Sequence, residues 1–394
     1  MGVLGFAALA ACSLTTSLDG LTGGPVETAD ASAPMDASPP MDASDEAKIV
    51  PSTGWAFRKS LTVDKSVVPS ATDLAEFPLL VSLTDADLRT TDSGGKVANG
   101  RDLAFFAADG VTPLAYEIES YASTTGQLIA WVKLPVLSAT MGAKLYLAFG
   151  NAQVTASLED RKGVWSSGFA AVWHMADATW TDSASGSTGN PVGVPTIAKT
   201  GQIGTAASFG ATDVYVGVGP DARFQPTSIT VSAWANPGSV GSAPDRHPYM
   251  LDQDTYRDTA SNPRGYYMEI YRTQTNPRPT FYTANGTELA HAFATTSVVN
   301  GTWYHVVGTR DETSGLTRIY VNGVEEGSAT MTGGIAYLPN KVQVGGFGSQ
   351  SWDGLLDEVR IAKGARDAGW IRTEYSNQSA PEKFVTVGPL QTTP

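Results

Sequence analysis

The sequence predicts an all-β protein, in which a β-sandwich-like domain precedes a larger two-sheet jelly roll. From Gly54 onward, short apolar runs alternate with clusters of Gly, Pro, Asn, Asp and Ser, which is typical of strands joined by turns. The first of two such blocks, residues 54–155, shows no long helical period. Asn322-Gly323 lies between two apolar runs and suits the two positive φ angles of a type I′ hairpin turn.

Each block contains several predicted strands. In the first block they are Ala56–Val63, Phe77–Leu83, Asp102–Phe106, Ala115–Ile118, Leu128–Leu134 and Lys144–Phe149. In the second block, residues 164–390, they include Ala170–Met175, Ala206–Phe209, Val214–Val218, Ile229–Ala235, Tyr266–Tyr271, Trp303–Thr309, Thr317–Val321, Val342–Gly345 and Leu355–Ile361. So many short strands in one segment predict a single two-sheet sandwich or jelly roll.

The N-terminus is typical of an exported protein. Residues 1–11 contain an apolar run that is too short to span a bilayer and has the length of a signal-peptide core. Leu9-Ala10-Ala11-Cys12 resembles the lipobox of bacterial lipoproteins, and the resemblance implies a lipidated Cys12 that anchors the protein to the cell envelope, at the outer membrane or the cell surface. The run lacks a preceding Lys or Arg. The alternative is a chance apolar N-terminus with a buried thiol.

Residues 12–53 predict a disordered tether. They are rich in Ala, Ser, Pro, Asp and Thr and cannot bury enough apolar surface to fold. The net charge of the chain is −13, and the first 53 residues hold seven acidic residues against one lysine. No basic patch is evident, so we expect no nucleic acid partner. Cys12 is the only cysteine, so we expect no disulfide in the exported part.

Both β-rich blocks resemble known bacterial families. The second is similar to the concanavalin A-like, laminin-G-like jelly roll in six pieces that begin at Val172, Asp182, Ile229, Trp303, Ile319 and Gly354. The first resembles a surface domain family of unknown function that often precedes such jelly rolls, with matches at Gly100–Phe105, Leu114–Glu119, Trp131–Pro135 and Leu145–Asn151.

The sequence offers no recognised catalytic constellation. Laminarinase-type enzymes that share this jelly roll carry Glu-x-Asp-x-x-Glu on one strand, and this string is absent from the sequence. Glu117-Ile118-Glu119 has the correct alternation but lies in the first block and lacks a third acid. His174 and His305 lie on predicted strands beside Trp and Val, and we expect structural roles for both. The interpretation is therefore a protein that is not an enzyme.

A sugar-binding face is predicted on the strand from Gly265 to Arg272. Its alternation places Tyr266, Met268 and Ile270 on a core face, and Tyr267, Glu269 and Tyr271 on the opposite face. Tyrosines and a carboxylate on one face are typical of carbohydrate recognition. The alternative is that these tyrosines only cover the sheet.

Asp357 raises a metal hypothesis. Strand alternation places its carboxylate on the same face as Val359 and Ile361, where an unpaired charge would cost several kcal/mol. In the family this aspartate lies near the start of the jelly roll, which implies a structural Ca²⁺ bound by Asp357, Asp177 and Asp182. The alternative is an aspartate that accepts hydrogen bonds and closes the sandwich without metal.

Together these features predict a non-catalytic cell-surface lipoprotein that recognises extracellular carbohydrate or a surface protein. Two alternatives stay open: a glycan-active enzyme or its accessory subunit, and a purely structural envelope protein.

Overall fold

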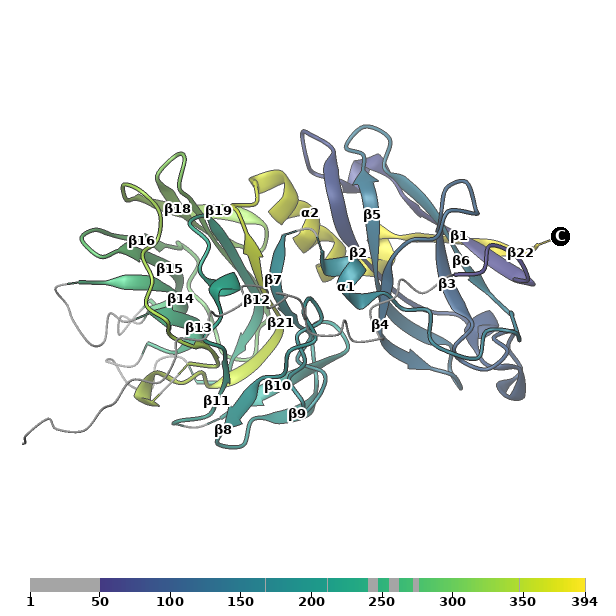
Figure 1. Cartoon of the computed structure of the whole chain (residues 1–394), viewed down its shortest axis with the longest axis horizontal. Coiled ribbons are helices and arrows are strands. Elements are labelled where there is room, and N and C mark those ends of the chain that lie inside the picture. Colours follow the sequence, from purple (N-terminus) through teal and green to yellow (C-terminus); the bar gives the residue numbers. More distant parts are fainter. Residues whose placement is uncertain are drawn as a thin grey trace, which may run out of the picture. The chain divides into compact units, whose positions relative to one another are not determined.

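The computed structural model of the chain describes residues 50–393 except 167, 211, 240–246, 255–261, 272–275 and 347. The predicted signal peptide, Cys12 and nearly all of the predicted tether lie outside the described residues. The described part is nearly all β, in four antiparallel sheets that form two sandwiches (Figure 1). The all-β prediction is confirmed. Among the described residues, no helix is long and apolar enough to cross a membrane.

The first sandwich packs a four-stranded sheet, ordered β22-β1-β6-β3, against a three-stranded sheet, ordered β2-β5-β4. Its strands are β1 (Phe57–Val63), β2 (Leu74–Thr84), β3 (Leu103–Ala107), β4 (Tyr116–Ala122), β5 (Gln127–Leu137), β6 (Ala143–Phe149) and β22 (Thr386–Thr392). The apolar residues of these strands alternate inward, as the period of a half-buried strand requires.

The second sandwich packs two larger sheets on one apolar core. One sheet is ordered β19-β18-β17-β12-β21-β10-β9, with β7 also paired to β21, and the other is ordered β16-β15-β14-β13-β20-β11-β8. Its strands are β7 (Phe169–Trp173), β8 (Asn190–Val192), β9 (Thr196–Thr200), β10 (Thr205–Phe209), β11 (Tyr215–Val218), β12 (Ile229–Pro237), β13 (Tyr249–Asp254), β14 (Arg264–Tyr271), β15 (Arg278–Asn285), β16 (Leu289–Phe293), β17 (Tyr304–Asp311), β18 (Leu316–Val321), β19 (Val324–Thr330), β20 (Val342–Val344) and β21 (Gly354–Lys363).

Helices are few and short among the described residues. The α-helices are α1 (Arg161–Trp165), α2 (Ala368–Ser379) and α3 (Pro381–Phe384), and the 3-10 turns are η1 (Lys65–Val67), η2 (Ala86–Leu88), η3 (Thr91–Ser93), η4 (Ala222–Phe224) and η5 (Gly348–Gln350). Helix α2 begins after Asp367, whose carboxylate accepts a hydrogen bond from the Trp370 backbone N–H at 2.8 Å and so caps the helix.

Two local predictions are confirmed. Asn322 and Gly323 form the turn between β18 and β19 with φ angles of 49° and 78°. Strand β14 places Tyr266, Met268 and Ile270 in the core of the second sandwich, as its alternation predicts. Both features depend on short-range chemistry, which a sequence displays directly.

The end of the chain returns to the first sandwich. Strand β22 pairs with β1, so the second block does not run unbroken to residue 390. Between the sandwiches, the buried side chain of Asn377 in α2 accepts a hydrogen bond from the Leu80 N–H at 2.7 Å and donates one to the Leu80 carbonyl at 3.0 Å. These contacts and the shared strand join residues distant in sequence into one compact unit.

The predicted alternation of β21 is wrong at Asp357. The core of the second sandwich contains Leu356, Val359 and Ile361. Leu356 and Val359 are three residues apart, so the alternation slips by one residue between them. The cause is a β-bulge, because the register between β12 and β21 shifts between Ser232 and Trp234, and Glu358 adopts a φ of 49°. Asp357 therefore does not share the core face with Val359 and Ile361.

Candidate functional site: an acid–histidine cluster and its cavity

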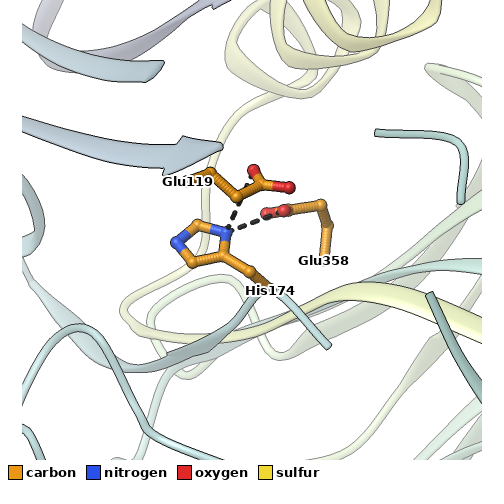
Figure 2. A group of neighbouring side chains, drawn as sticks. All are labelled: Glu119, His174 and Glu358. Carbon is orange, nitrogen blue, oxygen red and sulfur yellow. Dashed lines mark hydrogen bonds and ion pairs between the residues drawn. The ribbon is translucent and has the colours of Figure 1, made fainter. Parts of the chain in front are cut away.

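The β-bulge in β21 supplies two members of a buried charged group. We call Glu117, Glu119, His174, Asp357 and Glu358 the acid–histidine cluster. Glu117 and Glu119 extend from β4 of the first sandwich, His174 follows β7, and Asp357 and Glu358 lie in β21. Figure 2 shows Glu119, His174 and Glu358 converging on one another. The cluster thus draws on residues that are far apart in the sequence.

Strand pairing explains why the acids lie where they do. Strand β10 pairs with β21 from Gly354 to Leu356, and β7 pairs with β21 from Val359 to Ala362. Asp357 and Glu358 fall in the gap between these two partners. Because Trp173 at the end of β7 pairs with Val359, the residue after it, His174, comes beside Glu358. The gap in the sheet therefore creates the space that the side chains occupy.

His174 is the centre of the cluster. Its Nδ1 lies 2.7 Å from Glu358 Oε1 and 3.7 Å from Glu119 Oε2, and its Nε2 lies 3.2 Å from Glu117 Oε2. The side chain of His174 is 8% exposed, and those of the three glutamates are 1–3% exposed. The His174 imidazole thus contacts three buried carboxylates.

Further groups hold the carboxylates in place. Trp165 Nε1 and Ser183 Oγ each donate to Glu117 at 2.7 Å, and Trp131 Nε1 donates to Glu119 Oε2 at 2.9 Å. Arg360 Nη2 donates to Glu358 Oε2 at 2.6 Å.

The Arg360 guanidinium also lies 4.3 Å from the ring centre of Trp131. This distance suits a cation–π contact. Arg360 therefore both neutralises Glu358 and packs against the indole that positions Glu119.

Burial and charge separate the pKa values of the two β4 glutamates. Burial favours the neutral form of Glu117, but the positive charge of His174 and the hydrogen bonds from His174, Trp165 and Ser183 outweigh it and lower the pKa to about 2. Burial and repulsion from Glu358 raise the pKa of Glu119 to about 8. At neutral pH one glutamate is thus ionised and its neighbour is mostly protonated.

The pKa values of the other members of the cluster shift for related reasons. Burial opposes the charge of His174, but the carboxylates of Glu358 and Glu117 outweigh it and hold the pKa well above its usual range. Burial, followed by repulsion from Glu358 and Glu119, raises the pKa of Asp357 well above its usual range. Burial also opposes the charge of Glu358, yet His174 and Arg360 lower its pKa. Perturbed groups of this kind gather at functional sites more often than elsewhere.

A cavity of about 190 Å³ opens beside the cluster. Its walls combine indole rings, charged groups and hydroxyls, and they are Glu117, Ile118, Glu119, Arg161, Trp173, His174, Met175, Ala176, Asp177, Trp180, Thr181 and Ser183. This volume lies below the range of pockets that take drug-sized ligands, so the cavity has room for one small ring at most.

Backbone strain coincides with the cavity. Met175 and Trp180, which line it, have φ angles of 59° and 54°, and Glu358 has 49°. A left-handed conformation is costly for residues with such side chains, and it persists only where the surrounding structure holds it. Two of the three strained residues line the cavity, and the third, Glu358, belongs to the adjoining cluster.

The three aspartates predicted to bind calcium have separate partners. Asp182 is fully buried, accepts from the Val172 N–H at 2.8 Å and pairs with Arg223 Nη1 at 2.6 Å. Asp177 accepts from the N–H groups of nearby threonines at the surface. Asp357 accepts from the Ile203 N–H at 2.8 Å. In the described part of the chain the three do not form a ligand group, and calcium binding by them stays a prediction.

The predicted sugar-binding residues lie together on one face of β14. Tyr267 stacks on Tyr282 with ring centres 4.4 Å apart, and Glu269 Oε1 lies 3.8 Å from His291 Nε2. Tyr271 meets Phe293 edge-on at 5.1 Å. Tyr267 and Glu269 are buried, at 6% and 2% exposure, while Tyr271 is half-buried. Ligand binding by this face stays a prediction.

Sequence reasoning missed the cluster as a site. It noted Glu117 and Glu119 but found no third acid nearby, and it assigned His174 a structural role. The third acid is Glu358. It lies 239 residues after Glu119 in the sequence, and the fold places the two side by side. The only sequence signal was the pair of adjacent acids in an apolar strand, Asp357-Glu358, which suggests a break in the strand pairing.

One group of described residues could hold a metal ion, and its members are Glu119, His174 and Glu358. One ligand atom from each lies within 4.8 Å of the others. The group offers one imidazole nitrogen and two carboxylate oxygens, a donor set that suits borderline divalent ions.

Two family models match the chain. Residues 210–372 match the concanavalin A-like lectin/glucanases superfamily, and residues 99–172 match a domain of unknown function (DUF2341). The chain therefore contains a concanavalin A-like domain in its second sandwich, and the match to the uncharacterised domain runs from the first sandwich into β7 of the second. No curated protein sequence is significantly similar to the chain.

Several solved structures are similar to part of the chain. Domain 4 of AbnA, an extracellular arabinanase of family GH43 from Geobacillus stearothermophilus, solved with arabinotriose, is 18% identical over 53% of this chain and 98% of that domain, with a TM-score of 0.42. The binding domain of Paraclostridial Mosquitocidal Protein 1 is 10% identical over 55% of this chain and 52% of that one, with a TM-score of 0.44.

The botulinum neurotoxin serotype G binding domain is 13% identical over 54% of this chain and 51% of that one, also with a TM-score of 0.44. The chain spans about half the length of both toxin domains. These similarities concern the fold alone.

Proposed function

We propose that the protein recognises extracellular carbohydrate without modifying it, and that the cavity beside the acid–histidine cluster receives one sugar residue. The observation that carries this proposal is the mixed lining of the cavity. Trp173 and Trp180, at 2% and 5% exposure, form part of the apolar wall on one side of the cavity, and Arg161, Asp177 and Thr181 offer charged groups and a hydroxyl for the hydroxyls of a sugar. The match of residues 210–372 to a superfamily of lectins and glucanases supports carbohydrate as the ligand, while the cavity itself is lined by residues between 117 and 183.

The small volume limits the size of the ligand, and the size of the ligand limits the expected affinity. At about −0.4 kcal/mol per non-hydrogen atom, a sugar ring of about 12 such atoms binds with about −5 kcal/mol, which corresponds to a Kd of about 0.2 mM. Binding of this strength needs several copies of the protein or of the glycan at one surface. We therefore expect recognition of clustered terminal residues rather than of one long chain.

A glycan array probed with the purified full chain tests the proposal. Arg161→Ala is the informative variant because its side chain is 52% exposed and lines the cavity without belonging to a core. Arg318→Ala, on β18 and outside the cavity, is the matched control. We expect specific glycans that bind the wild type and the control but bind Arg161→Ala at least tenfold more weakly. An array without specific binding would overturn the proposal.

The same array separates the cavity from the aromatic face of β14. If Tyr271→Ala abolishes binding and Arg161→Ala does not, the ligand lies on the β14 face instead. A surface protein as the ligand, or a purely structural role, would leave the array negative.

One observation favours a second candidate, a glycan-active enzyme. Glu119, with a pKa near 8, and Glu117, with a pKa near 2, line the same cavity, and a protonated acid beside an ionised carboxylate is the pairing that glycosidases use. Release of reducing sugar by the wild type, lost in both Glu117→Gln and Glu119→Gln, would support this candidate over simple recognition.

The proposed location is the cell envelope, with lipid on Cys12 and residues 12–53 as a tether. Only the sequence supports this part. Mass spectrometry of the N-terminal peptide from a bacterial membrane fraction tests it. An acylated peptide that begins at Cys12 is expected, and Cys12→Ala should move the protein to the soluble fraction.

A further inference from the structure

The acid–histidine cluster contains more carboxylates than its positive groups can balance. Glu117, Glu119, Asp357 and Glu358 are buried together with His174. Two further positive charges contact them: Arg360 pairs with Glu358, and the exposed Arg161 lies 3.5 Å from Glu117. A buried carboxylate needs a proton, a paired cation or a metal ion. The question is which of these the geometry favours.

Two oxygens in this cluster have no partner. Glu119 Oε1 and Asp357 Oδ1 are buried and accept no hydrogen bond from any described residue. The Glu119 side chain is 2% exposed, and Asp357 is fully buried. A Cβ atom placed on Gly204 would lie 2.6 Å from Glu119 Oε1, so that glycine leaves room for the carboxylate. A buried oxygen without a donor is available to a cation or a proton.

We propose that Glu119, His174 and Glu358 bind one divalent metal ion. The ion takes the place of the proton between His174 Nδ1 and Glu358 Oε1, and that proton is released to solvent. In a tetrahedral site with ligands about 2.1 Å from the ion, neighbouring ligand atoms lie about 3.4 Å apart. The separations of His174 Nδ1 from Glu358 Oε1, 2.7 Å, and from Glu119 Oε2, 3.7 Å, bracket that value. One ligand atom of each residue lies within 4.8 Å of the others, and the three side chains point toward one another (Figure 2).

The surroundings of the three ligands support the same assignment. Metal-bound histidines commonly donate their other ring N–H to a carboxylate, and His174 Nε2 faces Glu117 Oε2 at 3.2 Å. Trp131 donates to Glu119, and Arg360 donates to Glu358 through the oxygen turned away from His174. Each ligand thus has an outer group that fixes its orientation.

The donor set determines which ion fits. Ca²⁺ takes six to eight oxygen ligands, whereas this group offers an imidazole nitrogen and few oxygens. An imidazole with two carboxylates suits Zn²⁺, Mn²⁺ or Co²⁺. Glu119 and His174 line the cavity, which gives an ion and its remaining water ligands a path from solvent. This inference does not depend on whether the cavity binds a sugar.

The test is titration of the purified, tag-free full chain with Zn²⁺, Mn²⁺, Co²⁺ and Ca²⁺ after treatment with chelator. We expect one equivalent of Zn²⁺ to bind, an increase in Tm, and visible absorption from bound Co²⁺ that indicates nitrogen and oxygen ligands. Glu119→Gln and His174→Gln should each weaken Zn²⁺ binding at least tenfold.

His305→Gln, which changes a buried histidine outside the group, is the matched control and should bind as the wild type does. Circular dichroism shows whether each variant is folded, and the wild-type titration holds even if one variant is not. The assignment would be overturned by no saturable binding of Zn²⁺, Mn²⁺ or Co²⁺ at 1:1, or by binding that both variants leave unchanged. Binding of Ca²⁺ alone, unaffected by Glu119→Gln, would also overturn it and would favour the aspartates Asp177, Asp182 and Asp357.

Discussion

The Nδ1 atom of His174 lies 2.7 Å from Oε1 of Glu358, and the backbone at Glu358 is left-handed, with a φ of 49°. The two residues are 184 positions apart and meet where β21 changes its neighbour from β10 to β7. A strained backbone that presents a buried carboxylate to a histidine links the fold directly to the candidate site.

Removing the charge of Glu358 should destabilise the protein strongly. In Glu358→Gln, the positive groups of His174 and Arg360 lose their shared partner inside the protein, and breaking a buried ion pair in this way costs about 3–5 kcal/mol. Urea unfolding of the chelator-treated protein measures the loss. Glu382→Gln, at an exposed position of α3, is the control and should change stability by less than about 0.5 kcal/mol. A similar value for both variants would contradict the prediction.

Gly204 should tolerate no side chain because of Glu119. Its φ is +51°, and a Cβ there would lie 2.6 Å from Glu119 Oε1. Gly301 has a φ of +76° with open space around it, so Gly301→Ala reports the backbone cost alone. We expect Gly204→Ala to lose about 1–3 kcal/mol more than Gly301→Ala, measured from urea midpoints. Equal losses would mean that the Glu119 carboxylate can move aside at little cost.

Asn377 should be essential to the attachment of α2. Asn377→Ala leaves the N–H and carbonyl of Leu80 without partners, which should cost about 2–4 kcal/mol. Asn377→Asp keeps the acceptor and loses the donor, so we expect an intermediate or larger loss, because it also buries a charge. Ser376→Ala on the same helix is the control. An Asn377→Ala variant as stable as this control would show that water replaces both hydrogen bonds.

Some structural features could be predicted from the sequence and others could not. The difference is how far apart along the chain the interacting residues lie. The turn at Asn322-Gly323 and the inward face of Tyr266, Met268 and Ile270 arise from local chemistry and were predicted correctly. The face of Asp357 was not, because a single bulge residue reverses strand alternation and leaves no distinct pattern in the sequence.

The acid–histidine cluster could not be predicted from the sequence for a different reason. Glu119 and Glu358 meet only because two sandwiches pack together, and their distance along the chain hides the relationship. The return of β22 to β1 was hidden in the same way, since pairing partners of distant strands carry no local signal.

His305 should make stability fall in acid. Burial, together with the positive charge of Arg360, lowers its pKa to about 3. The unfolded chain takes up a proton at an ordinary pKa of about 6.5, while the folded chain does not until about 3, so stability decreases as the pH falls through this interval.

His305→Gln removes that contribution. As the pH falls from 6 to 4, the wild type should therefore lose more stability than His305→Gln does. The difference between their free energies of unfolding should change by up to about 1.4 kcal/mol per pH unit. Chemical unfolding across this range measures it. A constant difference would contradict the lowered pKa of His305.

The most direct test of the central claim, that the cavity is the binding site, follows the indole N–H signals of the tryptophans by ¹H–¹⁵N NMR during titration with the strongest array glycan. Trp→Phe variants assign the signals. The account predicts that Trp173 and Trp180, which line the cavity, shift with a Kd of about 0.2 mM, while Trp55 in the first sandwich stays fixed. If the glycan binds and the signals of Trp173 and Trp180 do not move, the ligand lies elsewhere and the claim is wrong.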